Sequence, residues 1–269
     1  MANVEHDVRD FYDEFGWVAK DGELGEARFR EFSAPYYRYH DAVNRRTQAC
    51  FDGLTGTIMF AGGGDLPDPH TAIASQFRRV SCLDISRRAL SIAERKLGKK
   101  ATYLLGSVVD IPIAKNYCEA VFCAHVLYHV DKDHQERAIR ELIRVTKPGG
   151  RIVIVYQNPD SLASRVVSVK QRIPGVWKLQ RKSTGEGSRP PRPSLYFALH
   201  PLKWWQQFDP LCRISMLPWD VMSSDQEREL LWWDPLASAI YRLSGWFEQK
   251  FPARAARLTQ YPLIVLDKR

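Results

Sequence analysis

The sequence predicts an α/β fold with a doubly wound sheet of about seven strands, preceded by N-terminal helices and interrupted by an inserted cap. Apolar, strand-like runs alternate with segments of helical periodicity between residues 57 and 156. Such alternation is typical of a parallel sheet with helices on both faces. A glycine turn at residues 62–64 follows the first apolar run, and Asp84 ends the second. Glycines let the backbone approach a ligand and an aspartate can accept hydrogen bonds from a ribose, so this order indicates a nucleotide-type cofactor site.

Two amphipathic helices are expected before the first strand. Apolar side chains recur at helical spacing from Val4 to Phe15 and again from Tyr36 to Leu54.

The elements of the core follow from apolar runs and local caps. Strands are expected at 57–61, 80–84, 102–105, 120–124 and 151–156, and helices at 69–77, 86–97 and 133–145. Asp68 before Pro69 is the expected N-cap of the first of these helices, and Ser86 opens the second. Residues 147–150, Lys-Pro-Gly-Gly, indicate a helix end and a turn into the next strand.

The alternation stops after Tyr156. Residues 157–203 are rich in proline and indicate an insertion, not a regular βα unit. Order returns with strands expected at 212–217 and 262–267 around a helical, Trp-rich region at 225–258. We therefore divide the chain into an N-terminal helical lid (1–55), a core (56–156), a basic cap insertion (157–203) and a C-terminal part that completes the sheet (204–269).

Composition restricts the class of protein. The acidic N-terminal residues are unlike a secretory signal, and no apolar stretch approaches the length that spans a bilayer, which predicts a cytoplasmic protein. Five scattered cysteines without CxxC spacing favour reduced core thiols and no structural metal.

The charge is uneven. Residues 161–203 hold nine basic side chains against Glu186, which equals the net charge of +8 of the whole chain. This basic stretch favours an anionic partner, although a solvated loop has the same composition.

The ordered motifs are more specific than the glycine turn alone. TIMFAGGGDL, VSCLDIS, LLGSVVDIP, YCEAVFCAHVLYHV and RAIRELIRVTKPGGRIVIV follow one another across about 100 residues. This series resembles class I S-adenosylmethionine-dependent methyltransferases of the small-molecule type. The resemblance implies a Rossmann-like sheet, mostly parallel with its last strand antiparallel, and S-adenosylmethionine as cofactor.

The resemblance also implies which residues surround that cofactor. Gly62 and Gly64 would lie near its methionine part, Asp84 would bind both ribose hydroxyls, and Ile85 would pack on the adenine. The full expected set is Ala61, Gly62, Gly63, Gly64, Asp84, Ile85, Ser107, Val108, Asp110 and His125. Four positions depart from the family pattern. Phe60 stands where an acid is usual and Leu66 where a glycine is usual, and Ser107 and Glu119 each replace a common aspartate.

His125 and His129 are the candidate catalytic bases. They are four residues apart just after a strand, so they can share one side of a helical turn, and imidazole suits base chemistry at neutral pH. A role for His129 in orienting its loop, or a metal site with Asp133 or His134, are the alternatives.

Aromatic and polar side chains on both sides of the core are candidates for the acceptor site. In the resembling family these regions close over the acceptor. The expected contributors are Tyr12, Tyr36, Tyr37, His40, Asn44, Tyr196 and Trp204.

The sequence thus predicts methyl transfer to a small molecule, with O-methylation of a polar or anionic metabolite as the leading interpretation. C- or N-methylation of a natural product or lipid-like acceptor, RNA methylation and cofactor binding without catalysis are the alternatives. Nucleic acid is the less favoured partner because no RNA-binding motif accompanies the charge. Contact with a membrane surface through the apolar and basic residues after Leu162 stays open.

Overall fold

A seven-stranded sheet forms the centre of the computed structural model, which describes residues 4–20, 23–25, 32–172, 194–231 and 233–269. Its strand order is β5-β4-β3-β6-β7-β9-β8. The strands of this sheet are β3 (Thr57–Ala61), β4 (Arg79–Asp84), β5 (Ala101–Leu105), β6 (Cys118–Ala124), β7 (Thr146–Val155), β8 (Cys212–Asp220) and β9 (Tyr261–Lys268). A separate small hairpin pairs β1 (Ala19–Lys20) with β2 (Glu23–Leu24), and the sequence analysis did not predict it.

The direction of the strands confirms the predicted fold class. The strands from β5 through β7 are mutually parallel, whereas β9 runs antiparallel to both β7 and β8. The sequence order reverses between β3 and β6, next to one another at the centre of the sheet. Ligands of open α/β sheets bind at the carboxyl ends of strands beside such a reversal.

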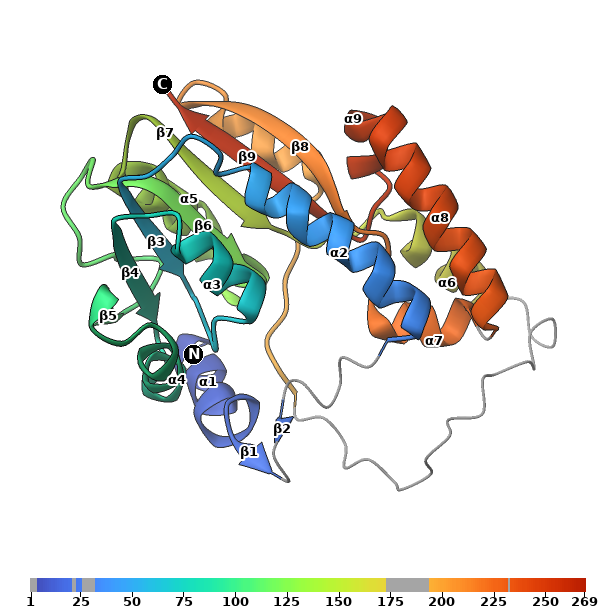
Figure 1. The fold of residues 1–269 in the computed structure, drawn as a ribbon, viewed down its shortest axis with the longest axis horizontal. Coiled ribbons are helices and arrows are strands. Elements are labelled where there is room, and N and C mark those ends of the chain that lie inside the picture. Colours follow the sequence, from blue (N-terminus) through green and yellow to red (C-terminus); the bar gives the residue numbers. More distant parts are fainter. Residues whose placement is uncertain (1–3, 21–22, 26–31, 173–193, 232) are drawn as a thin grey trace.

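Helices cover both faces of the sheet (Figure 1). They are α1 (Val4–Phe11), α2 (Ala34–Ala49), α3 (Asp68–Ala74), α4 (Arg87–Leu97), α5 (Gln135–Val145), α6 (Leu162–Arg172), α7 (Ser224–Leu230), α8 (Asp234–Lys250) and α9 (Pro252–Ala256). A π-helical turn at Tyr12–Gly16 continues α1, and a 3₁₀ helix at Leu202–Phe208 packs against the sheet. The described part of the insertion contains a helix, α6, in the segment that the sequence indicated to be an insertion outside the regular βα alternation. No helix among the described residues has the length and apolar character needed to cross a bilayer.

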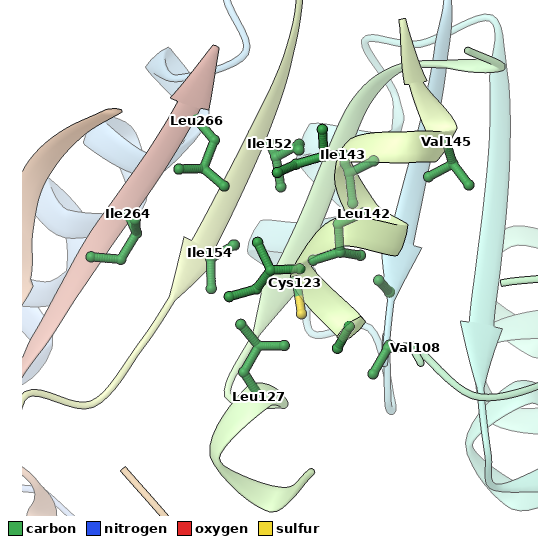
Figure 2. Close-up of a cluster of buried hydrophobic side chains, with 14 of the residues drawn as sticks. Val108, Cys123, Leu127, Leu142, Ile143, Val145, Ile152, Ile154, Ile264 and Leu266 are labelled. Carbon is green, nitrogen blue, oxygen red and sulfur yellow. The ribbon is translucent and has the colours of Figure 1, made fainter. Parts of the chain in front are cut away.

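Two apolar layers hold the helices to the sheet. On one face, α5 and the 3₁₀ helix pack on β3, β6, β7 and β9, and part of this layer is drawn in Figure 2. On the other face, α3, α4 and the end of α2 pack on the same strands. All five cysteines are buried free thiols, which confirms the prediction of reduced core cysteines. Burial raises the pKa of the Cys123 thiol to about 12, so this thiol is unreactive at neutral pH.

Local caps explain where two of these helices begin. The Ser86 hydroxyl accepts a hydrogen bond from the Ala89 amide at 3.1 Å, which confirms the predicted N-cap. The predicted cap at Asp68 is wrong. Asp68 is already the first residue of α3, Pro67 occupies the N-cap position, and no side chain caps this end. With Pro69 in the first turn, its missing amide hydrogen leaves one fewer donor to satisfy.

The Lys-Pro-Gly-Gly segment is a bulge inside β7 instead of a separate turn. Thr146 pairs with Cys118 and Arg151 pairs with Ala120, so residues 147–150 lie opposite Glu119 alone. Gly149 has φ +76°, and a Cβ on Gly150 would lie 2.7 Å from the Glu119 carbonyl oxygen. Both glycines are therefore required by the backbone, which explains why the motif ends in them.

Buried polar contacts join α2 to the end of β8 and to α8. The Tyr36 hydroxyl donates to Asp220 at 2.8 Å, and the Tyr39 hydroxyl donates to Glu248 at 2.6 Å. Burial is the main cause that raises the pKa of Glu248, while Arg46, 3.0 Å away, favours its charged form. Because these partners satisfy otherwise buried polar groups, α2 is fixed along α8, as Figure 1 shows.

Candidate active site

A cavity of about 530 Å³ lies at the carboxyl ends of β3, β4 and β6. Such a volume is typical of small-molecule sites. Its wall combines the glycine turn, the end of β4, the segment after β5, the segment after β6 and the N-terminal helix α1. In Figure 1, α1 lies beyond the arrowheads of β3 and β4, where it closes this end of the sheet.

The glycine turn is shaped for close approach. Gly62 and Gly64 have φ of +67° and +57°. A Cβ on Gly62 would lie 2.4 Å from a Val126 methyl group, and one on Gly64 would lie 2.8 Å from the Trp17 ring. The positive φ and the lack of space for a Cβ together explain glycine at positions 62 and 64 of this turn. Backbone hydrogen bonds hold it, because the Gly62 amide donates to the Leu83 carbonyl at 2.7 Å.

Asp84 is buried at the base of the cavity. Its carboxylate accepts hydrogen bonds from the Gly64 amide at 3.0 Å and the Ser86 amide at 2.9 Å. These donors favour the charged form, but burial outweighs them and raises the pKa of Asp84 to about 6. The nearby Asp13 carboxylate adds to this rise, and it accepts a hydrogen bond from the Ser86 hydroxyl at 2.5 Å.

Ligand affinity at this carboxylate is expected to depend on pH. Two ribose hydroxyls donate best to the charged form, whereas ligand-free Asp84 is mostly protonated below about pH 6. The affinity for S-adenosylhomocysteine should therefore be constant at pH 7–8 and fall by up to about tenfold per unit below pH 6. Titration calorimetry across this range measures the slope, and Asp84→Asn should remove it. A flat profile for the unaltered protein would place the ribose elsewhere.

The same shift predicts the sign of a stability change. The folded pKa of Asp84 lies above its ordinary value of 3.8, so the folded protein holds a proton that the unfolded chain releases. Protonated Asp84 therefore stabilises the folded state. This stabilisation is fully present below about pH 4 and is lost as the pH rises through about 6.

The far end of the glycine turn has an unusual set of side chains. Phe60 is buried at the end of β3, and its ring stacks toward His70 at 6.3 Å. His70 and Asp65 line the cavity, and Asp65 lies 3.8 Å from Lys96. Leu66 is fully buried with φ +47°, a backbone region that leucine seldom adopts. The departures from the expected pattern thus lie beside two ionisable side chains of the cavity wall.

His125 stands in a strained position directly after β6. Its φ is +62°, in the left-handed region. Its Nδ1 lies 2.7 Å from the Tyr128 hydroxyl, and its ring contacts the rings of Trp219 and Tyr261 at 5.0 and 5.1 Å. These three neighbours hold the imidazole against the cavity wall, between the glycine turn and the start of β9.

His129 is oriented by the backbone. Its Nδ1 lies 2.8 Å from the Tyr196 carbonyl oxygen, which can only accept. In the neutral form the Nδ1 therefore carries the proton and Nε2 is the basic atom. The Tyr196 hydroxyl in turn accepts a hydrogen bond from the Lys132 amide at 3.1 Å, so the segment after the insertion holds this loop in place.

The structure brings most of the expected residues to this cavity. Its lining includes Gly62, Gly63, Gly64, Asp84, Ile85, Ser107, Val108, His125, His129 and Tyr12.

The remaining expected residues do not line it. Ala61 is buried in the core below the turn, and Asp110 is exposed. Tyr36 and His40 belong to the buried network around Asp220, although the Trp219 ring lies between His40 and His125, 5.4 and 5.0 Å from them. The others are Tyr37, which is exposed, and Asn44, which is half-buried on α2. Tyr196 holds the His129 ring with its carbonyl and the Lys132 amide with its hydroxyl, and Trp204 stacks on His200 at 4.1 Å.

Several lining residues stand outside the cofactor, catalytic and acceptor sets expected from the sequence, although His134 was named there as a possible metal ligand. They are Val4, Glu5, Val8, Trp17, Asp65, Pro67, His70, Gly106, Val109, Ala124, Val126, Val130, Asp131 and His134. The apolar spacing of Val4 and Val8 predicted a helix but not what the helix covers. Nothing local marks Trp17 or His70, because only the fold places them at the glycine turn.

Apart from the Tyr12 phenol, the ionisable side chains that line the cavity are carboxylates and imidazoles. Among the lining residues that the structure describes there is no lysine or arginine. The described residues also contain no group of three histidine, cysteine or acidic side chains arranged to hold a metal ion. Of the nine basic residues after Ser161, five (Lys178, Arg181, Lys182, Arg189 and Arg192) lie outside the described residues.

Comparison with known proteins agrees with this geometry. Residues 62–154 match the family model described as a methyltransferase domain. A ubiquinone/menaquinone biosynthesis C-methyltransferase of Yersinia pestis (strain Pestoides F) is 28% identical over 152 residues, which are 51% of this chain and 59% of that protein. The chain thus spans about three fifths of the length of the curated relatives that it matches.

Solved structures share the fold at low identity. An N-methyltransferase, NodS, from Bradyrhizobium japonicum WM9, solved with S-adenosylhomocysteine, aligns over 97% of this chain and 98% of its own at a TM-score of 0.57 and 10% identity. The geranyl diphosphate C-methyltransferase of Streptomyces coelicolor A3(2) covers 100% of this chain and 98% of its own at a TM-score of 0.57 and 14% identity. These similarities concern the fold.

Proposed function

We propose that this chain, whose residues 62–154 form a methyltransferase domain on a class I fold, transfers a methyl group from S-adenosylmethionine to a small-molecule acceptor. One observation carries the proposal. A single cavity holds the positive-φ glycine turn, the buried Asp84 and two histidines whose rings are held by hydrogen bonds.

Each part of the cavity suits one part of the cofactor. Asp84 accepts hydrogen bonds from the ribose hydroxyls with a carboxylate that the turn already orients. Ile85 and Val108 supply apolar contact for the adenine, and Ser107 lies at the same side of the cavity. Gly62 and Gly64 line the cavity, and without side chains their backbone allows close approach of the methionine part.

We assign the amino-acid end of the cofactor to His70 and Asp65. Phe60 removes the acid that the resembling family has at the end of the first strand, and both side chains line the cavity next to it. A carboxylate attracts the cofactor's ammonium group, and an imidazole can donate to its carboxylate.

S-adenosylmethionine supplies an activated methyl group on a sulfonium, so the protein mainly has to align the acceptor and remove its proton. His129 is the proposed base. Its Nδ1 is held by the Tyr196 carbonyl, so its Nε2 would take the acceptor's proton while the acceptor bonds to the methyl carbon and the sulfur–methyl bond breaks, with S-adenosylhomocysteine as leaving group. His125, wedged between Trp219, Tyr261 and Tyr128, orients the acceptor on the same side.

For the acceptor we propose a hydroxyl-bearing small molecule. An anionic acceptor, which the basic insertion favours by sequence, receives no support from the described cavity wall, where no lysine or arginine is present. C-methylation of a lipid-like acceptor is the second candidate, and it is favoured by the relatives, which are named as C-methyltransferases of ubiquinone/menaquinone biosynthesis.

The decisive experiment combines binding with transfer. We expect S-adenosylhomocysteine to bind with one site per chain in titration calorimetry. Incubation with [methyl-¹³C]S-adenosylmethionine and panels of phenolic, sugar and quinol acceptors should give one labelled product, whose ¹³C chemical shift separates an O-methyl from a C-methyl group. Absence of S-adenosylhomocysteine binding would refute the proposal. Binding without a labelled product in any panel would favour a non-catalytic cofactor-binding protein instead.

A further inference from the structure

A second hollow, of about 580 Å³, opens between α6 and α8 and is closed at its ends by α7 and α9. It shares no lining residue with the active-site cavity. Its volume lies within the range of small-molecule pockets, and clefts between helices are a common place for them. We call it the helical cleft.

One wall of the helical cleft is the apolar face of α6. Leu162, Val166 and Val169 recur at helical spacing, and all three line the cleft. Their exposed fractions are 55, 45 and 55%. These exposed aliphatic side chains line a hollow. Such a surface is one that a ligand can cover.

The opposite wall and the floor are also apolar. Leu236, Ile240 and Phe247 of α8 line the cleft at helical spacing, and Met222 and Leu231 are buried below them. An elongated ligand between α6 and α8 would therefore touch aliphatic or aromatic groups on both sides.

Among the described residues that line the cleft, Arg165 is the one cationic side chain not paired with an acid. Lys170 donates to the Glu229 carbonyl oxygen at 2.8 Å, and the Glu248 carboxylate is held by Tyr39 and Arg46. Arg165 lines the cleft, is exposed, and forms no ion pair with any acid that the structure describes. An anionic group at the edge of the cleft is thus complementary to Arg165.

We propose that the helical cleft binds the aliphatic chain of a single anionic amphiphile, of the fatty-acid class, with the chain between α6 and α8 and the carboxylate at Arg165. The site is separate from the proposed methyl-transfer site and does not depend on it.

Chain length is the first test. Titration calorimetry of the intact protein with octanoate, decanoate and dodecanoate, each below its critical micelle concentration, should give one site per chain. Each added pair of methylene groups should tighten binding by about tenfold while the cleft has room. Equal affinity across the series, binding of several molecules per chain, or binding only to lipid vesicles would overturn the proposal.

Blocking the cleft is the second test. Val166→Trp and Ile240→Trp, on opposite walls, should each weaken dodecanoate binding by at least tenfold. Leu243→Trp is the matched control, because Leu243 lies on α8, is 62% exposed and does not line the cleft. Circular dichroism and thermal unfolding of all three variants verify folding without reference to the proposed cofactor site. Wild-type dodecanoate affinity in both blocked variants would overturn the proposal.

Arg165→Gln tests the charge separately. It should weaken dodecanoate by about threefold and leave the neutral dodecanol unchanged, as expected for a partly exposed ion pair. An equal effect on both ligands would remove Arg165 from the site.

Discussion

Asp84→Ala is expected to weaken S-adenosylhomocysteine binding by at least about a hundredfold. The proposed site makes two hydrogen bonds from ribose hydroxyls to this carboxylate, and hydrogen bonds to charged groups contribute about 1.5–3 kcal/mol each. The substitution also deprives the Gly64 and Ser86 amides of their acceptor, so the turn that lies under the ligand loses its anchor. Titration calorimetry measures the loss directly, and it should appear at pH 7.5, where wild-type Asp84 is charged.

Asp110→Ala is the matched control for this experiment. The motif comparison assigned Asp110 to the same cofactor, but its side chain is exposed and does not line the cavity. We therefore expect wild-type affinity in Asp110→Ala. Folding of both variants is checked by circular dichroism and thermal unfolding. A folded Asp84→Ala protein with unchanged affinity, or an Asp110→Ala protein as weak as Asp84→Ala, would contradict the proposed ribose site.

These two aspartates also show how far sequence reasoning extends. The position of Asp84 follows from the order of neighbouring elements in the chain. In a parallel sheet of this kind, the last residue of the second strand lies beside the turn that follows the first strand. Asp110 lies beyond β5 in a segment whose path depends on packing against α5, where Arg144 donates to the Ile111 and Ile113 carbonyls. No local pattern reports that path, so the motif alone does not show that the Asp110 side chain lies outside the lining of the cavity.

The fold was more predictable than the surroundings of the site. All seven strands of the main sheet and most core helices follow from apolar periodicity, which depends on residues near one another in the chain. The position of α2 does not, because it is set by hydrogen bonds from Tyr36 and Tyr39 to acids about two hundred residues away. The aromatic character of the side chains on α2 therefore suggested an acceptor site. In the structure, Tyr36 and Tyr39 fix α2 to β8 and α8 instead.

His129→Ala is expected to lower kcat by about 10²–10⁴ for an acceptor that loses a proton, because proton removal by a positioned base contributes that much. The KM for S-adenosylmethionine should change little, since the proposed role of His129 concerns the acceptor. Single-turnover rates with the acceptor identified in the labelling experiment measure the loss. Added imidazole should restore part of the rate, which a purely structural role of His129 would not allow.

His134→Ala and His125→Asn separate the base from its surroundings. His134 also lines the cavity, but its side chain is exposed and lies at the start of α5, so its removal should leave kcat near wild type. Asparagine tolerates the φ of +62° at position 125, so His125→Asn keeps the backbone while the ring contacts with Trp219 and Tyr261 are lost. We expect this variant to have a higher KM for the acceptor. Its kcat should keep the wild-type dependence on pH, because that dependence reports the titration of the base. If His125→Asn abolished that response and His129→Ala retained both its rate and its pH profile, the base would be His125, and the Tyr196 carbonyl would serve only to hold the loop.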